Sequence, residues 1–235
     1  METLAFYVVM GVTYLFSLVV RRRLNLTYSK YSRVPNHAGF NGGQVARGIL
    51  DSNGLRDVQL ELARGNLTDH YDPRTRVIRL SLENARDASV AAMAVSAHEE
   101  AHALQDADDY APLELRTSIL PLVQAGARLG IPVAIFGSLL DSRPMFLLGT
   151  LAYLGSIVFQ FITLPVEFDA SRRALVQLKK LGITRDEQEE REARETLRAA
   201  AMTYVAGAAS AAGFVLLIGL DFLRAVGRAP RARGL

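Results

Sequence analysis

The segment His98-Glu99-Glu100-Ala101-His102 contains the residues of this sequence that are best suited to chemistry. On a helix, side chains four positions apart lie on one face, so both imidazoles can reach a single metal ion. Zinc accepts imidazole nitrogens at about 2.0–2.1 Å, and catalytic sites keep one coordination position open for water. Glu99 follows the first imidazole directly, where it can take a proton from that water. The pattern predicts a hydrolytic zinc site in which His98 and His102 are metal ligands and Glu99 is the general base.

The same spacing also arises by chance on solvent-exposed helices, so the motif needs support from the rest of the chain. Two of the four histidines in the sequence fall in this one turn, which favours a metal site. A catalytic zinc needs a third protein ligand, and Glu167 is the candidate because a carboxylate at the end of an uncharged stretch is costly unless a cation faces it. The alternative for Glu167 is a helix N-terminus after Pro165, where acidic residues are favourable. Two imidazoles and a carboxylate suit Zn2+ best among the divalent ions.

Apolar residues make up 50% of the 235 residues and are concentrated in four long stretches. The stretches cover residues 3–20, 119–140, 145–166 and 199–220. Each approaches the roughly 20 residues that are needed to cross a hydrocarbon core. In the first stretch the charges follow the apolar run, which favours an uncleaved anchor over a signal peptide. We therefore expect a mainly α integral membrane protein with four transmembrane helices.

The lysines and arginines next to these stretches indicate the orientation in the membrane. If the four spans alternate, most of these lysines and arginines fall on the side of the metal helix. Basic residues favour the cytoplasmic side, so the protein is expected to be multi-pass with its active site facing the cytoplasm. The basic tail, 224–235, falls on the opposite side, which leaves open a re-entrant or interfacial fourth segment. Arg128 lies inside the second span and is a functional-site candidate, with pairing inside the bundle or snorkelling as the alternatives.

The region before the metal helix reads as a small antiparallel β-hairpin. Residues 58–62 alternate as a strand, 64–66 form a turn, and the chain from 67 runs into Asp69-His70-Tyr71. Residues 72–75 are a strong turn sequence, and 76–81 read as the strand that returns. The metal helix should then begin near 84–87. A hairpin at this position offers an edge strand to which an extended peptide can add, although an ordinary structural hairpin explains the pattern equally well.

His70 and Tyr71 are the polar residues of this hairpin that could take part in catalysis. Both could donate a hydrogen bond to a developing oxyanion, and the alternative is that they are turn or surface residues. Together with Glu99 they form the predicted catalytic set.

Further helices are predicted on both sides of the membrane-spanning hairpin. Residues 39–54 read as a short helix that ends at Asn53-Gly54, and 24–36 read as a linker. A charged helix is expected to begin at Thr184 as its N-cap, after Gly182 ends the helix before it.

These features divide the chain into six predicted segments. They are an N-terminal transmembrane helix with a basic stop (1–23), a cytoplasmic α+β zincin-like region with the hairpin and the metal helix (24–117), a transmembrane hairpin (118–166), cytoplasmic helices with the third ligand (167–198), a fourth transmembrane helix (199–223) and a basic tail (224–235).

Three segments carry a resemblance to a known family. They are Leu67-Thr68-Asp69-His70-Tyr71-Asp72-Pro73-Arg74, His98-Glu99-Glu100-Ala101-His102-Ala103-Leu104-Gln105 and Pro165-Val166-Glu167-Phe168-Asp169-Ala170-Ser171-Arg172-Arg173-Ala174. Together with the N-terminal apolar span, they resemble the YugP-like neutral zinc metallopeptidases of bacterial membranes over essentially the whole chain. More distantly they are similar to membrane zincins of the HtpX and CAAX-prenyl-protease type, in which a Glu from a later helix completes the metal site.

The resemblance implies a gluzincin-like zinc metallopeptidase of the bacterial cytoplasmic (inner) membrane. It implies a site made of the metal ligands His98, His102 and Glu167 and the general base Glu99. The distant relatives carry an Asp four positions after the ligand Glu, and this chain has Ser171 there. Any role in supporting a metal ligand by a hydrogen bond should therefore fall to Asp169 or be absent.

The expected function is that of a membrane-embedded zinc-dependent endopeptidase. The alternatives are a non-catalytic scaffold or adaptor protein whose metal clamps two helices together, and a transporter that uses Arg128. The expected partners are a peptide or protein substrate, the lipid bilayer, and a membrane partner protein or further copies of the chain. Nucleic acid is not expected, because the cations that raise the pI to 9.3 cluster at span ends, where lipid headgroups account for them.

Overall fold

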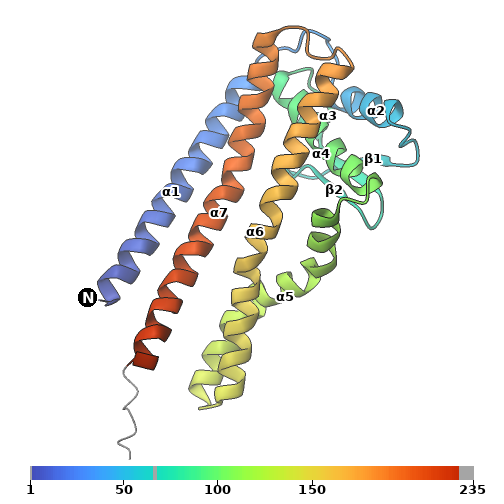
Figure 1. Ribbon diagram of the computed structural model, residues 1–235. Coiled ribbons are helices and arrows are strands. Elements are labelled where there is room, and N and C mark those ends of the chain that lie inside the picture. Colours follow the sequence, from blue (N-terminus) through green and yellow to red (C-terminus); the bar gives the residue numbers. More distant parts are fainter. Residues whose placement is uncertain (1, 66–67, 228–235) are drawn as a thin grey trace, which may run out of the picture.

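A computed structural model of the chain describes the backbone of residues 2–65 and 68–227, with side chains for 8–65 and 68–213 (Figure 1). The long helices in this part of the chain are α1 (Glu2–Tyr31), α5 (Ala111–Leu139), α6 (Arg143–Lys180) and α7 (Glu187–Gly227). The shorter elements are α2 (Gly42–Ser52), α3 (Leu82–Arg86), α4 (Val90–Ala107) and the strands β1 (Gln59–Ala63), β2 (His70–Asp72) and β3 (Val77–Ser81). The short elements gather at one end of the long helices, and the far ends of the long helices extend well beyond them (Figure 1).

Two of the four predicted membrane spans are supported among the described residues. Helices α5 and α6 are long and apolar enough to cross a membrane, and only 11% of the most apolar window of each is buried. Such outward-facing apolar helices suit a lipid environment. The predicted spans at 3–20 and 199–220 lie in α1 and α7 and extend into residues whose side chains are not described, so four spans stay a prediction. The predicted tail lies outside the described residues from 228 onward.

Small residues allow α5 and α6 to pack closely as an antiparallel pair. Gly126 and Gly137 of α5 and Gly149 of α6 are buried. A Cβ added at Gly149 would overlap the backbone nitrogen of Ala134, and one at Gly126 would overlap the carbonyl of Ala152. Glycine is therefore needed at these positions for the two backbones to approach each other.

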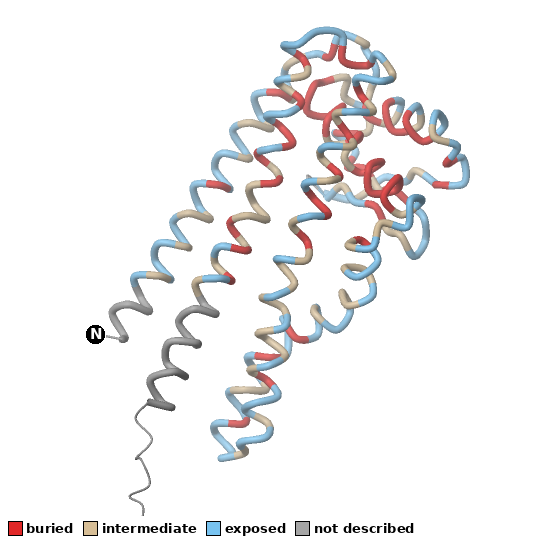
Figure 2. The backbone as a smooth tube through the Cα atoms, in the orientation of Figure 1, coloured by how far each residue is buried: buried red, intermediate tan, exposed pale blue. Residues whose placement is uncertain are grey.

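The core of the molecule surrounds α4. Figure 2 shows that buried residues are concentrated in the short elements and in the adjoining parts of the long helices. Helix α4 begins after Ser89, whose hydroxyl accepts a hydrogen bond from the backbone nitrogen of Ala92. Helix α2 packs against α4 through its apolar face, in which Val45 and Ile49 are fully buried. A helix that is buried on most sides can hold ligand side chains in a fixed position.

The sheet differs from the predicted hairpin. Its strand order is β1-β3-β2 in the described chain, and β1 pairs with β3 in parallel, so the prediction that the strand at 58–62 belongs to an antiparallel sheet is wrong. The turn after Asp72 is correct, but it joins β3 to the short strand β2, which is the antiparallel partner. Because β1 and β2 lie on opposite edges of β3, the chain crosses the end of the sheet between them. This crossover makes β1 run in the same direction as β3.

Several helix boundaries also differ from the predictions. The predicted linker 24–36 is helical as far as Tyr31, and α6 and α7 each run unbroken through a change from apolar to polar sequence. Composition marks where a helix changes its surroundings rather than where it ends. All five boundaries between the six predicted segments therefore fall inside helices, and the functional division stays a prediction. The metal helix begins at Val90, with α3 before it. The charged helix begins at Glu187, where the Asp186 carboxylate, rather than Thr184, accepts from the backbone nitrogen of Glu189 at 2.8 Å.

Candidate metal centre

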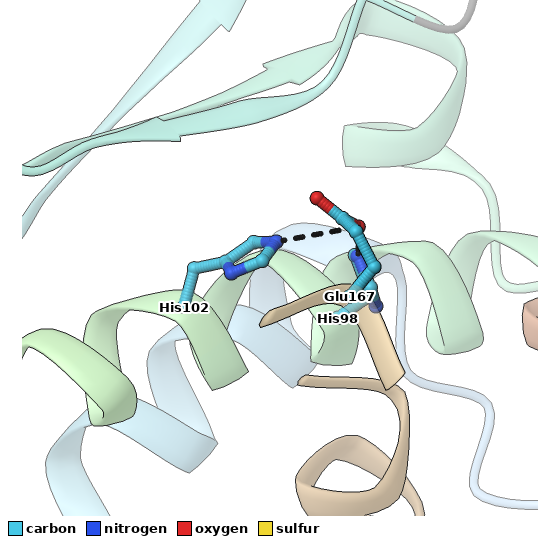
Figure 3. Close-up of side chains that lie close together, drawn as sticks. All are labelled: His98, His102 and Glu167. Atoms are coloured by element: carbon cyan, nitrogen blue, oxygen red, sulfur yellow. Dashed lines mark hydrogen bonds and ion pairs between the residues drawn. The ribbon is translucent and has the colours of Figure 1, made fainter. Parts of the chain in front are cut away.

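The three predicted metal ligands converge. Two imidazoles from successive turns of α4 and one carboxylate from α6 point toward one another (Figure 3). The ligand atoms of His98, His102 and Glu167 all lie within 4.8 Å of one another. Nε2 of His98 is 3.1 Å from Oε2 of Glu167, and Nε2 of His102 is 3.8 Å from the same oxygen. Ligand atoms of a tetrahedral zinc are about 3.4 Å apart, so these separations fit a zinc ion after small side-chain adjustments.

Glu167 is held in place from two sides. It lies in the interior of α6, far from the helix start at Arg143, which excludes the alternative that it stabilises a helix N-terminus. Its side chain is 2% exposed, and Oε1 accepts a hydrogen bond from Nη1 of Arg116 at 3.0 Å. The other oxygen, Oε2, therefore faces the imidazoles. An ionised carboxylate at this depth needs such cationic partners.

His102 is oriented by a hydrogen-bonded chain. The Gln105 amide nitrogen donates to the carbonyl oxygen of Val166 and to Oδ2 of Asp169, both at 2.9 Å. These two bonds fix the orientation of the amide, so its oxygen faces Nδ1 of His102 at 2.9 Å and accepts the Nδ1 hydrogen. The Nε2 lone pair of His102 is then free for a metal. Asp169, which the sequence analysis expected to support a metal ligand, thus acts on the imidazole through Gln105.

Ser171 lies beside the other imidazole. Its Oγ is 3.4 Å from Nδ1 of His98. This is the position at which the distant relatives carry an Asp, and the serine still provides a polar atom next to the ring. The sequence prediction gave this position no role, because a hydroxyl is a weaker acceptor than a carboxylate.

Glu99 lies next to the three ligands. It is 8% exposed, and it lines the same cavity as His98 and Glu167. Burial raises the pKa of Glu99 to about 7, with His98 opposing the shift and the Glu167 charge adding to it. A general base works best when its pKa is close to the working pH.

Glu100, the next residue on α4, has different surroundings from Glu99. It is fully buried, does not line that cavity, and its carboxyl oxygens have no hydrogen-bond partner among the described residues. Burial, followed by the charge of Glu99, raises the pKa of Glu100 well above its usual range. Glu100 therefore favours its protonated form more than a solvent-exposed glutamate does, and it forms part of the core.

A cavity of about 350 Å³ opens beside the ligands. Its walls include residues 69–74 of the sheet region and, on α5, the residues from Leu113 to Gln124 that face the ligands. Both predicted hairpin residues lie there. The Tyr71 hydroxyl donates to Oδ2 of Asp106 at 2.8 Å, and burial together with this bond raises its pKa. His70 is exposed, with Nδ1 2.8 Å from the carbonyl oxygen of Thr68.

Two further residues of the cavity were missed by the sequence analysis. Arg116 was counted only as a charge near a span end, and Tyr204 lies in the apolar stretch 199–220, where nothing distinguishes it from a lipid-facing residue. Tyr204 lines the cavity from α7 and interacts with the Glu167 carboxylate. Arg128, in contrast, is exposed on α5 and does not line this cavity.

Comparison with known proteins agrees with this geometry. The model of a family described as "Putative neutral zinc metallopeptidase" matches residues 6–220, which include all the residues of the metal centre. The chain belongs to this family. It is also 42% identical over 186 residues to "Putative membrane protease YugP" of Bacillus subtilis (strain 168), and the match covers 79% of this chain and 82% of that protein. The predicted family resemblance is therefore confirmed. The comparison with solved structures returned no match.

Proposed function

We propose that the protein is a membrane-embedded zinc-dependent endopeptidase. The observation that carries this proposal is the convergence of Nε2 of His98, Nε2 of His102 and Oε2 of Glu167 next to Glu99. Structural zinc sites use four protein ligands, whereas three ligands beside a carboxylate and a cavity suit a site that admits water and substrate. The family membership supports the same activity.

Each residue of the metal centre has its own role in the proposed peptide hydrolysis. His98, His102 and Glu167 would hold Zn2+, which when bound supplies a Lewis acid and lowers the pKa of a coordinated water to about 7. Glu99 accepts the proton of the attacking water and passes it to the leaving amine. Gln105, supported by Asp169, keeps His102 in the ligating tautomer.

The developing oxyanion of the substrate needs a hydrogen-bond donor. His70, Tyr71 and Tyr204 all line the cavity and are the candidates for this role. Tyr204 has the strongest case, because its contact with Glu167 places it beside the metal centre, whereas the hydroxyl of Tyr71 is directed toward Asp106.

The substrate in this proposal is an extended peptide or protein segment. The strand order leaves β2 with a free edge, and β2 residues line the cavity. Addition of a peptide to that edge would give main-chain hydrogen bonds that do not depend on side-chain identity. We further propose a multi-pass arrangement in the cytoplasmic membrane with the centre facing the cytoplasm, which the distribution of basic residues supports.

A matched pair of variants tests the proposal. In Glu99→Gln, peptide cleavage by the purified, zinc-loaded protein should fall by at least about 100-fold while its zinc content is retained. Glu100→Gln replaces a buried acid that does not line the cavity by its isosteric amide, and it should keep most of the activity. Cleavage of an unstructured protein is followed by gel and mass spectrometry, and zinc by elemental analysis. Full cleavage by Glu99→Gln would show that the assignment of the base is wrong.

The alternative of a metal-clamped scaffold is supported by the same link between α4 and α6. In that case the native protein would bind zinc and cleave nothing, and Glu99→Gln would leave its stability and partner binding unchanged. The experiment above therefore separates the two functions.

A further inference from the structure

A second groove, of about 470 Å³, lies between α6 and α7. One face of α6 forms one wall, with residues spaced three and four apart from Phe168 to Lys179. One face of α7 forms the other wall, from Glu190 to Ala201. The volume lies within the roughly 300–1,000 Å³ that small-molecule sites occupy.

The groove is strongly cationic. Its basic residues are Arg172, Lys179, Arg194 and Arg198, and its acidic residue is Glu190. Lys179 pairs with Glu190, and Arg172 pairs with Asp169.

Arg194 and Arg198 carry the excess positive charge. They lie one turn apart on α7 and have no ion pair or hydrogen bond among the described residues. Two like charges at this spacing repel each other, so an anion placed between them would relieve the repulsion. Thr184, which also lines the groove, has a buried hydroxyl without a hydrogen-bond partner in the described chain.

The rest of the groove is apolar, and its position matches the membrane surface. The uncharged stretch 145–166 of α6 ends one residue before Glu167, and Phe168 is the first groove residue beyond it. Phe168 and Val176 are 49% and 54% exposed, although both are large apolar side chains. An apolar wall that continues from a membrane span can contact the acyl chains of a phospholipid, and the basic pocket above it can bind the charged headgroup.

We propose that this groove binds an anionic membrane phospholipid, with its phosphate between Arg194 and Arg198 and its acyl chains along Phe168. Arginine suits this role because its guanidinium group can bind two phosphate oxygens at once. Basic pockets between membrane helices on the cytoplasmic side commonly bind such headgroups. The inference rests on the proposed membrane arrangement and does not depend on peptide hydrolysis.

Lipid titration of the purified full-length protein in detergent tests the inference. Phosphatidylglycerol or phosphatidylcholine is added, and the bound lipid is counted by native mass spectrometry. We expect tighter binding of phosphatidylglycerol, and an affinity about 30-fold weaker in the double variant Arg194→Gln/Arg198→Gln, or about fivefold for each arginine. The double variant Arg21→Gln/Arg22→Gln removes two exposed arginines next to the N-terminal apolar stretch, and should bind as the native protein does.

Three results would overturn the inference. Equal losses in both double variants would mean that general surface charge attracts the lipid. Equal binding of the two lipids by the native protein would exclude a phosphate-selective site for anionic lipid. Displacement of phosphatidylglycerol by inorganic phosphate at equal concentration would mean that the groove binds the free anion.

A second variant guards against misfolding of the glutamine variant. Arg194→Lys/Arg198→Lys keeps both charges but loses the planar donor pairs, and it should bind phosphatidylglycerol several-fold more weakly than the native protein. Native affinity in this variant would contradict the proposed arginine–phosphate contact. Helix content, measured by circular dichroism, should be unchanged in every variant.

Discussion

At the scale of single residues, the metal centre depends on the partners of the two carboxylate oxygens of Glu167. Arg116 takes one carboxylate oxygen, and the imidazoles face the other. The HExxH spacing and Glu167 were predictable from sequence, because helix periodicity and the cost of an uncompensated carboxylate both apply locally. Arg116 and Tyr204 were not, because their roles arise only when α5 and α7 pack beside α4 and α6.

Arg116 provides the first prediction. Arg116→Gln should weaken zinc binding by about 10–100-fold, the usual effect of removing a partner of a ligand, because Glu167 loses the contact that directs Oε2 toward the imidazoles. Zinc affinity is measured by competition with a chelating dye. Arg128→Gln changes an exposed arginine of the same helix and should leave the affinity unchanged. Equal affinities in native protein and Arg116→Gln would refute the positioning role.

Tyr204 provides the second prediction. Tyr204→Phe should lower kcat about 100-fold when it is assayed at saturating zinc, because it removes a donor to the oxyanion. Tyr71→Phe should affect kcat little, since the hydroxyl of Tyr71 donates to Asp106. Steady-state kinetics on one peptide compares the two variants. The opposite ranking would assign the donor to Tyr71.

At the scale of elements, local signals predicted which segments are helical but not how the strands pair. The spacing of apolar residues predicted α2, and Gly182 predicted the end of α6. Gly182 indeed adopts a positive φ of 62°. The pairing of β1 was mispredicted because successive turns indicate consecutive antiparallel strands, whereas β1 pairs in parallel with β3. β2 is three residues long, too short for a recognisable alternation.

The close packing of α5 and α6 gives a third prediction. Gly149→Val should destabilise the protein by about 1–3 kcal/mol, because the new side chain would overlap the backbone of α5. Gly155→Val, on the same helix, meets nothing within 4 Å and should have a small effect. Thermal unfolding in detergent, followed by circular dichroism, measures both. Similar unfolding temperatures for the two variants would contradict this packing.

At the scale of the whole molecule, the metal centre links segments that are distant in sequence. α4 and α6 contribute ligands about a third of the chain apart, and a metal that binds both stabilises only the folded arrangement. Ligand binding of this kind adds about 2.7 kcal/mol of stability when the free ion is at 100 times its dissociation constant.

Metal removal therefore provides a fourth prediction. Adding excess chelator to the zinc-loaded protein should lower its unfolding temperature by several degrees, and restoring zinc should reverse the change. His98→Ala lacks a ligand, so its unfolding temperature should respond little to either treatment. A native protein whose unfolding temperature is unaffected by chelator would argue against zinc at this centre.

The continuity of α6 fixes the distance between the metal centre and the end of the apolar stretch 145–166. Glu167 directly follows the uncharged stretch 145–166 in an unbroken helix that rises about 1.5 Å per residue. In the proposed membrane arrangement, this helix places the metal centre within a few ångströms of the bilayer surface. The distance of a peptide bond from the bilayer would then determine whether it is cleaved. Substrates anchored in the same bilayer should be cut close to the point where they leave it, and moving a cleavable sequence outward along a stiff helical spacer should abolish its cleavage in reconstituted vesicles.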